Sequence, residues 1–208
     1  MARHPRNEGV GALHHVVAQA PSDGRIVRDD SDRLHLLDEL RLAAGVSGWQ
    51  CIAYGVMETH LHLVLCTPEP NLARGMNTLL GRYSFAHNRR HGRRGHLFSD
   101  RYWSRRIDKP HYLCCAALYA VLNPVKAGLC THPSEFAWSS YGETAGLRPT
   151  DFIEPEPLLR TLAEDQEAAR QQYRAIVDTA VQRLHRRRIE EAWWKTVAQV
   201  VDETRTPA

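Results

Sequence analysis

The chain has 208 residues, of which 43% are hydrophobic and 25% are charged. These are globular proportions, so the composition excludes global disorder and leaves room for one ordinary domain with an appendage. The formal net charge is only +3, but it is unevenly distributed. Residues 82–106 contain eight arginines and one aspartate, so this segment carries +7 and the rest of the chain carries −4. A near-neutral total therefore hides a basic segment on a mildly acidic body.

We expect neither a targeting segment nor a disulfide framework. The first residues are polar, and no apolar stretch approaches the about 20 residues of a membrane span, so we expect a soluble cytoplasmic protein. The five cysteines are an odd number without a C-x-x-C pair, which suits neither a disulfide framework nor a zinc finger. We therefore expect reduced thiols.

The first 125 residues show alternating strand and helix signals. Strands are expected at 13–20, 48–56, 60–66 and 101–107. A first helix is expected from a cap at Asp30 or Ser31 to Gly45, a second from a cap at Asn71 through residue 85, and a third at 109–122. A polar loop is expected at 87–96.

The order β-α-β-β-α-β, followed by helix, is typical of the ferredoxin-like (RRM-like) α+β fold, an antiparallel sheet covered by helices. The composition changes after Trp138, and a proline-bearing linker at 148–157 leads into helical segments at about 158–180 and 181–203. We therefore predict a catalytic or binding domain over 1–150 and a helical C-terminal extension over 151–208.

An H-x-H pair lies on the third predicted strand. His60 and His62 project to one face of that strand, because side chains alternate, while Leu61, Leu63 and Leu65 project to the other. Two imidazoles about 7 Å apart at the backbone can converge on one divalent ion with open positions for water or phosphate. The alternative is a pair of solvent-facing strand histidines.

A second pair lies on the third predicted helix. Tyr119 and Asn123 are four residues apart, so they share a helix face about 6 Å apart along the axis. An amide oxygen is a hard ligand suited to Mg²⁺ or Mn²⁺, and a phenol beside it is a candidate nucleophile. The alternative is a core tyrosine and an Asn-Pro helix terminator, because Pro124 disfavours helical geometry at residue 123.

Four sequence blocks lie in one order over residues 13–141: METHLHLVL at 57–65, GRYSFAHNRRHGRRGHLFSDRYWS at 81–104, LNPVKAGL at 122–129 and WSSY at 138–141. With these blocks the chain resembles the HUH single-tyrosine transposases, particularly the bacterial REP-associated tyrosine transposases. The resemblance implies a metal-dependent transposase, a single-stranded DNA endonuclease and strand transferase.

By position, the resemblance makes His60, His62 and Asn123 ligands of a divalent metal (Mg or Mn) and Tyr119 the catalytic nucleophile. It implies that the ion polarises a phosphate of single-stranded DNA and that the phenolate attacks it. The products are a 5′-phosphotyrosine and a free 3′-hydroxyl, and the reverse step joins strands. The implied partner is a REP-like single-stranded hairpin DNA, bound by a monomer or homodimer near the nucleoid.

Two positions depart from the family pattern. Glu58-Thr59 stands where relatives have Pro-Asn, and Leu118 precedes the tyrosine where many relatives have arginine. Leu118 therefore replaces a cation that would lie beside the phosphate, and the loss of this charge is expected to weaken DNA positioning or slow cleavage. For the His14-His15 pair on the first strand, a structural or DNA-facing role is favoured over a metal role.

The basic segment mixes cations with aromatics, as surfaces that bind phosphates and stack unpaired bases do. We expect it to bind DNA, although a solvated basic loop is the simpler alternative. The predicted DNA-binding residues are Arg82, Arg89, Arg90, Arg93, Arg94, Arg101, Tyr102, Trp103, Arg105 and Arg106. A second basic cluster at 183–188, before Trp193 and Trp194, fits either packing or hairpin recognition.

Two other functions compete with the transferase. The same architecture also occurs in non-catalytic RRM-like modules that bind single-stranded nucleic acid through strand aromatics. A two-histidine phosphoesterase would need two H-x-Ser/Thr motifs, whereas the chain has a single one, at 132–134, and the H-x-H pair at 60–62 is not of that form.

Overall fold

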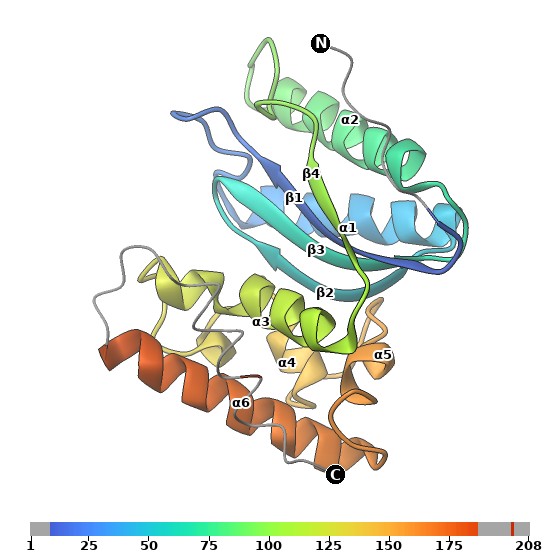
Figure 1. Cartoon of the computed structure of the whole chain (residues 1–208). Coiled ribbons are helices and arrows are strands. Elements are labelled where there is room, and N and C mark those ends of the chain that lie inside the picture. The colour runs from blue at the N-terminus through green and yellow to red at the C-terminus, as the bar shows by residue number, and fades with distance from the viewer. Residues whose placement is uncertain (1–8, 187–200, 202–208) are drawn as a thin grey trace.

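The computed structural model describes residues 9–186 and residue 201, and its elements follow the predicted order (Figure 1). The strands are β1 (Ala12–Gln19), β2 (Gln50–Val56), β3 (His60–Thr67) and β4 (Trp103–Ile107). The long helices are α1 (Asp30–Ser47), α2 (Leu72–Arg90), α3 (Pro110–Lys126) and α6 (Gln166–Arg186). Three short helical turns lie between α3 and α6: η1 (Pro133–Glu135), α4 (Tyr141–Thr144) and α5 (Glu156–Leu159).

The four strands form one antiparallel sheet in the order β2-β3-β1-β4. The central strands β1 and β3 are adjacent although α1 and β2 separate them in the sequence, which is the split arrangement of the ferredoxin-like fold. The predicted α+β class is therefore confirmed.

Each face of the sheet carries its own core. Helices α1 and α2 cover one face, where Leu61, Leu63 and Leu65 of β3 are buried among helix side chains. Helix α3 covers part of the other face (Figure 1). Val64 and Ile107 are buried in the core on that side. Because the apolar side of β3 fills the first core, its histidine side faces α3, as the alternation predicts.

Helix boundaries depart from the predictions in three places. α1 is capped by Asp29, whose side chain accepts from the Asp32 N–H, and it ends at Gly48 with a positive φ of 65°. Gly45 lies inside α1, because burial of the helix outweighs the about 1 kcal/mol that a helical glycine costs. α2 continues to Arg90, because buried His87 extends its inner face, so the loop expected at 87–96 begins only at residue 91. α3 passes through Asn123 and Pro124, so the predicted termination there was wrong.

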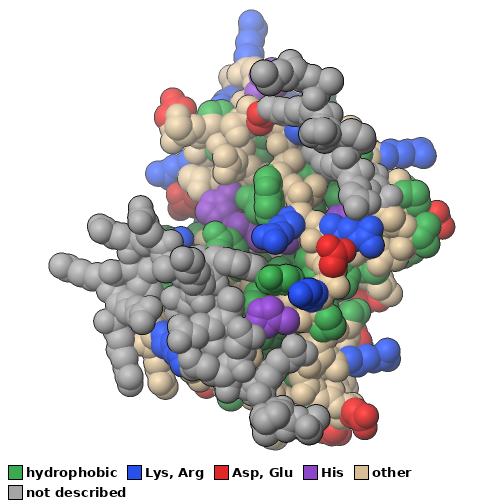
Figure 2. All heavy atoms as spheres, viewed as in Figure 1, with side chains coloured by type: hydrophobic (Ala, Val, Ile, Leu, Met, Phe, Trp, Pro, Cys, Tyr) green, Lys and Arg blue, Asp and Glu red, His purple; other side chains and the backbone are tan. Residues whose placement is uncertain are grey.

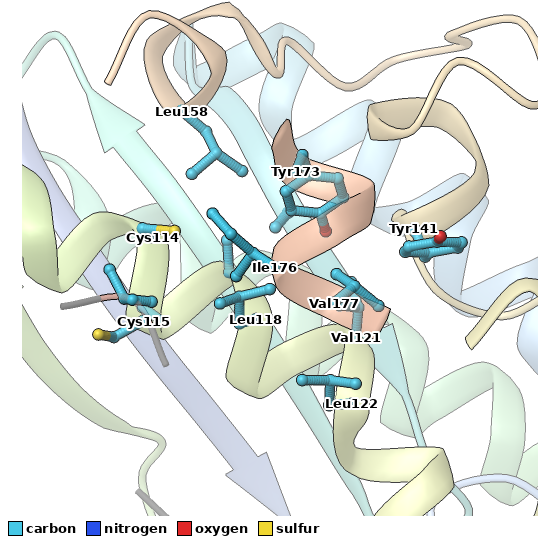
Figure 3. Packing of buried hydrophobic residues seen from close by; sticks show 14 of the residues in the cluster. Cys114, Cys115, Leu118, Val121, Leu122, Tyr141, Leu158, Tyr173, Ile176 and Val177 are labelled. Carbon is cyan, nitrogen blue, oxygen red and sulfur yellow. The ribbon is translucent and has the colours of Figure 1, made fainter. Parts of the chain in front are cut away.

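The outer side of α3 packs against α6 (Figure 3). Leu118, Val121 and Leu122 of α3 contact the cluster that contains Tyr173 and Ile176 of α6. Helix α3 is therefore held between the sheet and the C-terminal helix. That 151–208 form a separate extension stays a prediction, and most of the expected segment 181–203 lies outside the described residues.

All five cysteines are free, which confirms the expected reduced thiols. Within the described part of the chain, no helix combines the length and apolarity that crossing a membrane requires.

Candidate active site

A cavity of about 710 Å³ opens between the sheet and α3. Three strands, α3 and the segment before β4 line it. The lining residues are His15, Val17, Gln19, His60, His62, Ser99, Asp100, Arg101, Trp103, Arg105, Tyr119, Asn123 and Lys126. All four residues predicted to carry the chemistry are among them. Figure 2 shows the molecule from the same side as Figure 1, and histidine side chains lie close to Lys or Arg side chains near the middle of that view.

Strand register explains why the strand residues meet. In the antiparallel pair β1–β3, Val17 lies opposite His62 and residue 19 lies opposite His60. In the pair β1–β4, Val17 also lies opposite Trp103, and His15 lies opposite Arg105. Directly opposed residues project to the same face, so the three strands present one continuous polar surface beneath α3.

The two histidines of β3 are oriented by different neighbours. His60 Nδ1 lies 2.9 Å from the Thr59 hydroxyl, and His62 Nδ1 lies 3.3 Å from His15 Nε2. Their ring centroids are 4.8 Å apart. Because each Nδ1 has a neighbour, each Nε2 is the nitrogen that can serve as a ligand in the cavity. Thr59 thus has an orienting role of the kind that partners of metal-binding histidines commonly play.

The environment keeps these imidazoles neutral. Burial lowers the pKa of His60, and Lys126 lowers it further, although a hydrogen bond with the Asn123 side chain opposes the shift. The pKa of His62 is lowered well below its usual value by burial first and then by His60 and His15. Burial, reinforced by Arg105, lowers the pKa of His15 to about 4. Neutral imidazole is the form that binds a metal ion.

Helix α3 brings the phenol and the amide to the histidines. The Tyr119 ring centroid lies 5.1 Å from that of His62 and 5.8 Å from that of His15. Asn123 Nδ2 donates a 2.8 Å hydrogen bond to the carbonyl oxygen of Tyr119, one turn earlier. The Asn123 side chain also hydrogen-bonds His60, so its amide oxygen could serve as a ligand atom if an ion replaced that bond. Burial raises the pKa of Tyr119, so its phenol is neutral until a cation stabilises the anion.

A glycine permits this close approach. A Cβ built at Gly55 of β2 would lie 2.4 Å from the carbonyl oxygen of Ala120. Gly55 is directly opposite His62 in the β2–β3 pair, and Ala120 directly follows the tyrosine. Because glycine has no side chain, α3 can approach the sheet closely at this point. Gly55 therefore sets the distance between β3, which carries His62, and α3, which carries Tyr119. The Ala120 carbonyl is also the one that residue 124 would bond in a regular helix, and Pro124 has no N–H to donate.

The predicted DNA-binding residues separate into groups. Arg101, Trp103 and Arg105 line the cavity, and Trp103 is 50% exposed. Arg89 and Arg94 are exposed and Arg93 is half-buried, in the stretch from the end of α2 into the following loop. Only the first group is brought together with the tyrosine and the histidines.

The remaining predicted DNA-binding residues already have protein partners. Arg82 Nε lies 2.6 Å from Glu39, Arg90 Nη1 lies 2.7 Å from Asp29, and Arg106 Nε lies 2.9 Å from Asp108. Tyr102 is buried against the core of the α1–α2 face, so its ring is not available for stacking as it lies. This is because strand alternation sends the side chain of residue 102 away from that of Trp103.

Several lining residues escaped prediction from the sequence. Lys126, Gln19 and Asp100 belong to no recognisable motif, and it is the fold that brings them to the cavity. His15 is the exception, because a histidine on the first strand was visible in the sequence. Strand pairing places it opposite Val64, diagonally across from His62, and its Nε2 lies 3.3 Å from His62 Nδ1. His14, its neighbour, lies opposite Leu65 and therefore faces the other side of the sheet.

The described residues also include a His/Asp group that could hold a metal ion, and it is not the predicted one. Asp32 of α1 and His87 and His91 at the end of α2 place one ligand atom each within 4.8 Å of the others. Burial lowers the pKa of His87 to about 4, although Asp32 raises it, so this imidazole is neutral at pH 7.

The sheet order, its covering helices and the helix over the histidine face allow a fold-level comparison with solved structures. A solved structure of a REP-associated tyrosine transposase bound to a REP hairpin shares this fold, with a TM-score of 0.61 and 16% sequence identity. The match covers 74% of this chain and 94% of that chain, and eight chains of solved structures match altogether. No family model and no curated protein matches the sequence.

Proposed function

We propose that this chain is a metal-dependent DNA strand transferase that cleaves and rejoins single-stranded, hairpin-forming DNA through a 5′-phosphotyrosine intermediate. One observation carries the proposal: Tyr119, His60, His62 and Asn123, drawn from a strand and a helix far apart in sequence, line the same cavity. The fold shared with a hairpin-bound transposase supports the same class of substrate.

The donor set fits a divalent ion. Two neutral imidazoles and one amide oxygen supply three ligands, and the open cavity leaves positions for water or phosphate oxygens. When bound, such an ion would neutralise charge that develops on the phosphoryl oxygens. His60, His62 and Asn123 would hold it, with Thr59 and His15 fixing the imidazole orientations.

Tyr119 would act on the phosphate that this site positions. Its phenol loses a proton to water, and its oxygen attacks phosphorus while the bond to the 3′-oxygen breaks. The 3′-hydroxyl leaves, and the 5′-phosphate remains on the tyrosine. Attack by another 3′-hydroxyl reverses the step, so joining needs no nucleotide cofactor, because the phosphotyrosine retains the energy of the cleaved bond.

Single-stranded DNA would reach the tyrosine along the β4 side of the cavity. Arg101 and Arg105 provide cations there, and the half-exposed indole of Trp103 provides a stacking surface. Arg105 also lies 5.7 Å from the Tyr112 ring, which fixes its guanidinium at the cavity edge.

Binding is expected to weaken with salt, and Arg105→Gln is expected to make the dependence shallower. On single strands each neutralised phosphate contributes about −0.7 to the slope of log affinity against log salt, so the variant should lose about that much. Fluorescence anisotropy with a labelled hairpin at several salt concentrations measures it. Arg74→Gln is the matched control, because Arg74 is an exposed arginine of α2 outside the cavity. An equal change of the salt slope in both variants would show that Arg105 does not contact the bound DNA.

The proposal as a whole is tested with a labelled hairpin oligonucleotide. Incubation with Mg²⁺ or Mn²⁺ should give a protein–DNA adduct that survives denaturing electrophoresis, and excess chelator should prevent it. Binding without any adduct, across a panel of hairpins and both metals, would favour the non-catalytic RRM-like module. The exposed Trp103 on the sheet face is the feature that such a module would use.

A further inference from the structure

A polar cluster joins α1 to α2 on the side of the sheet opposite the cavity. Asp32 lies in the first turn of α1, and His87 and His91 lie one turn apart at the end of α2. His91 Nε2 is 2.9 Å from both Asp32 oxygens, and His87 Nε2 is 3.6 Å from Asp32 Oδ2. The two imidazole centroids are 4.5 Å apart. Three donor atoms thus converge between two helices.

His87 is the unexplained member of this cluster. Its side chain has no exposed surface, yet neither ring nitrogen has a hydrogen-bond partner among the described residues. Its Nε2 points toward a carboxylate at 3.6 Å, which is beyond hydrogen-bond length. Buried polar atoms without partners are rare and costly, and a bound ion or water is a common reason for them.

The spacing of the donors suits a small metal ion. Ligands bound tetrahedrally at about 2.1 Å lie about 3.4 Å from one another. The two His–Asp separations, 2.9 and 3.6 Å, are close to that value. Two imidazoles with one carboxylate favour zinc over magnesium, which prefers an all-oxygen shell.

Arg90 would compete with a metal ion for the carboxylate of Asp32. Its guanidinium contacts Asp32 Oδ1, but it also pairs with Asp29 through two hydrogen bonds of 2.7 and 2.8 Å. It therefore keeps a partner if an ion takes Asp32. The Arg28 backbone N–H donates to Asp32 Oδ2 at 2.9 Å and holds the carboxylate in place.

We propose that Asp32, His87 and His91 form a structural zinc site that clamps the start of α1 to the end of α2. Half-buried His91 leaves the fourth position accessible to water. The clamp fixes the point from which the segment 91–102 departs, and that segment delivers Arg101 to the cavity on the other face. The site is thus separate from the metal site of the strand transferase and independent of it.

Zinc binding by a variant that lacks the cavity histidines tests the proposal. His60→Ala/His62→Ala removes the other candidate ligands, and the protein is stripped with chelator and dialysed against micromolar Zn²⁺. One zinc per chain is expected by mass spectrometry of the metal. Co²⁺ in its place should give the visible absorption of a four-coordinate site. An absence of bound metal would identify the cluster as a metal-free hydrogen-bond network and overturn the proposal.

Further substitutions assign the ligands. Adding His91→Gln should weaken zinc binding at least about 100-fold, because even outer-shell partners are worth 10–100-fold. Adding His35→Gln, an α1 histidine outside the cluster, should leave it unchanged. In chelator the His91 variant should melt at a lower temperature, because it loses the hydrogen bonds with Asp32. Adding zinc should raise the melting temperature only of the two proteins that keep His91. Equal zinc binding with and without His91 would contradict the site.

Discussion

Tyr119→Phe is expected to abolish the covalent adduct while leaving hairpin affinity nearly unchanged. The phenol oxygen is the proposed nucleophile, and among the described residues that line the cavity the other hydroxyl belongs to Ser99. Removing the atom that attacks should lower the cleavage rate at least about 10⁴-fold, or about 5 kcal/mol of transition-state stabilisation. Quantifying the adduct by denaturing electrophoresis, with affinity from anisotropy, separates chemistry from binding.

Tyr173→Phe is the matched control for that substitution. Tyr173 is a fully buried tyrosine of α6, and its hydroxyl has no hydrogen-bond partner within the described part of the chain. Its removal should therefore leave both the fold and the adduct intact. An adduct of wild-type intensity from the Tyr119 variant would transfer the nucleophile to another residue.

Gly55→Ala is expected to damage stability and activity together. The new methyl group would meet the Ala120 carbonyl at 2.4 Å, and because the contact is with backbone, α3 as a whole must move away from the sheet. Overpacking of this kind costs about 1–3 kcal/mol. The same displacement separates the tyrosine from the histidines, and about 1 Å of misplacement can cost 10²-fold in rate. Denaturant unfolding and the initial rate of adduct formation measure the two effects.

Gly45→Ala should have the opposite effect on stability. Gly45 lies inside α1, and no other described residue would come within 4 Å of a Cβ there. The alanine should stabilise the protein by about 0.5–1 kcal/mol without changing the adduct rate. If Gly55→Ala were as stable and as active as this control, the close approach of α3 would not be what positions the tyrosine.

Much of the site could be predicted because it depends on local periodicity. The face shared by His60 and His62 follows from strand alternation, and the face shared by Tyr119 and Asn123 follows from helical spacing. The helices and strands were found for the same reason. That both faces line one cavity required the fold, which the resemblance implied and the structure bears out.

The DNA-binding surface was predicted less sharply because net charge does not reveal pairing. The sequence suggests that Arg82 and Arg90 are free cations. In the structure Arg82 pairs with Glu39 and Arg90 pairs with Asp29, some 40 to 60 residues away in the chain. Asp32, His87 and His91 were missed for a related reason. No spacing rule joins α1 to the end of α2, and the segment 87–96 was expected to be loop, which concealed the one-turn relation of the two histidines.

Pro124 gives α3 an uneven stiffness. The turn between Tyr119 and Asn123 contains a carbonyl, that of Ala120, to which residue 124 has no N–H to donate, so this turn resists bending less than its neighbours. On one side of it stands the proposed nucleophile, and on the other stands the third proposed ligand. In the proposed mechanism, the compliance of this one helical turn would govern how far the phenol oxygen can move relative to the proposed ligands, while α6 and the sheet hold the rest of the helix.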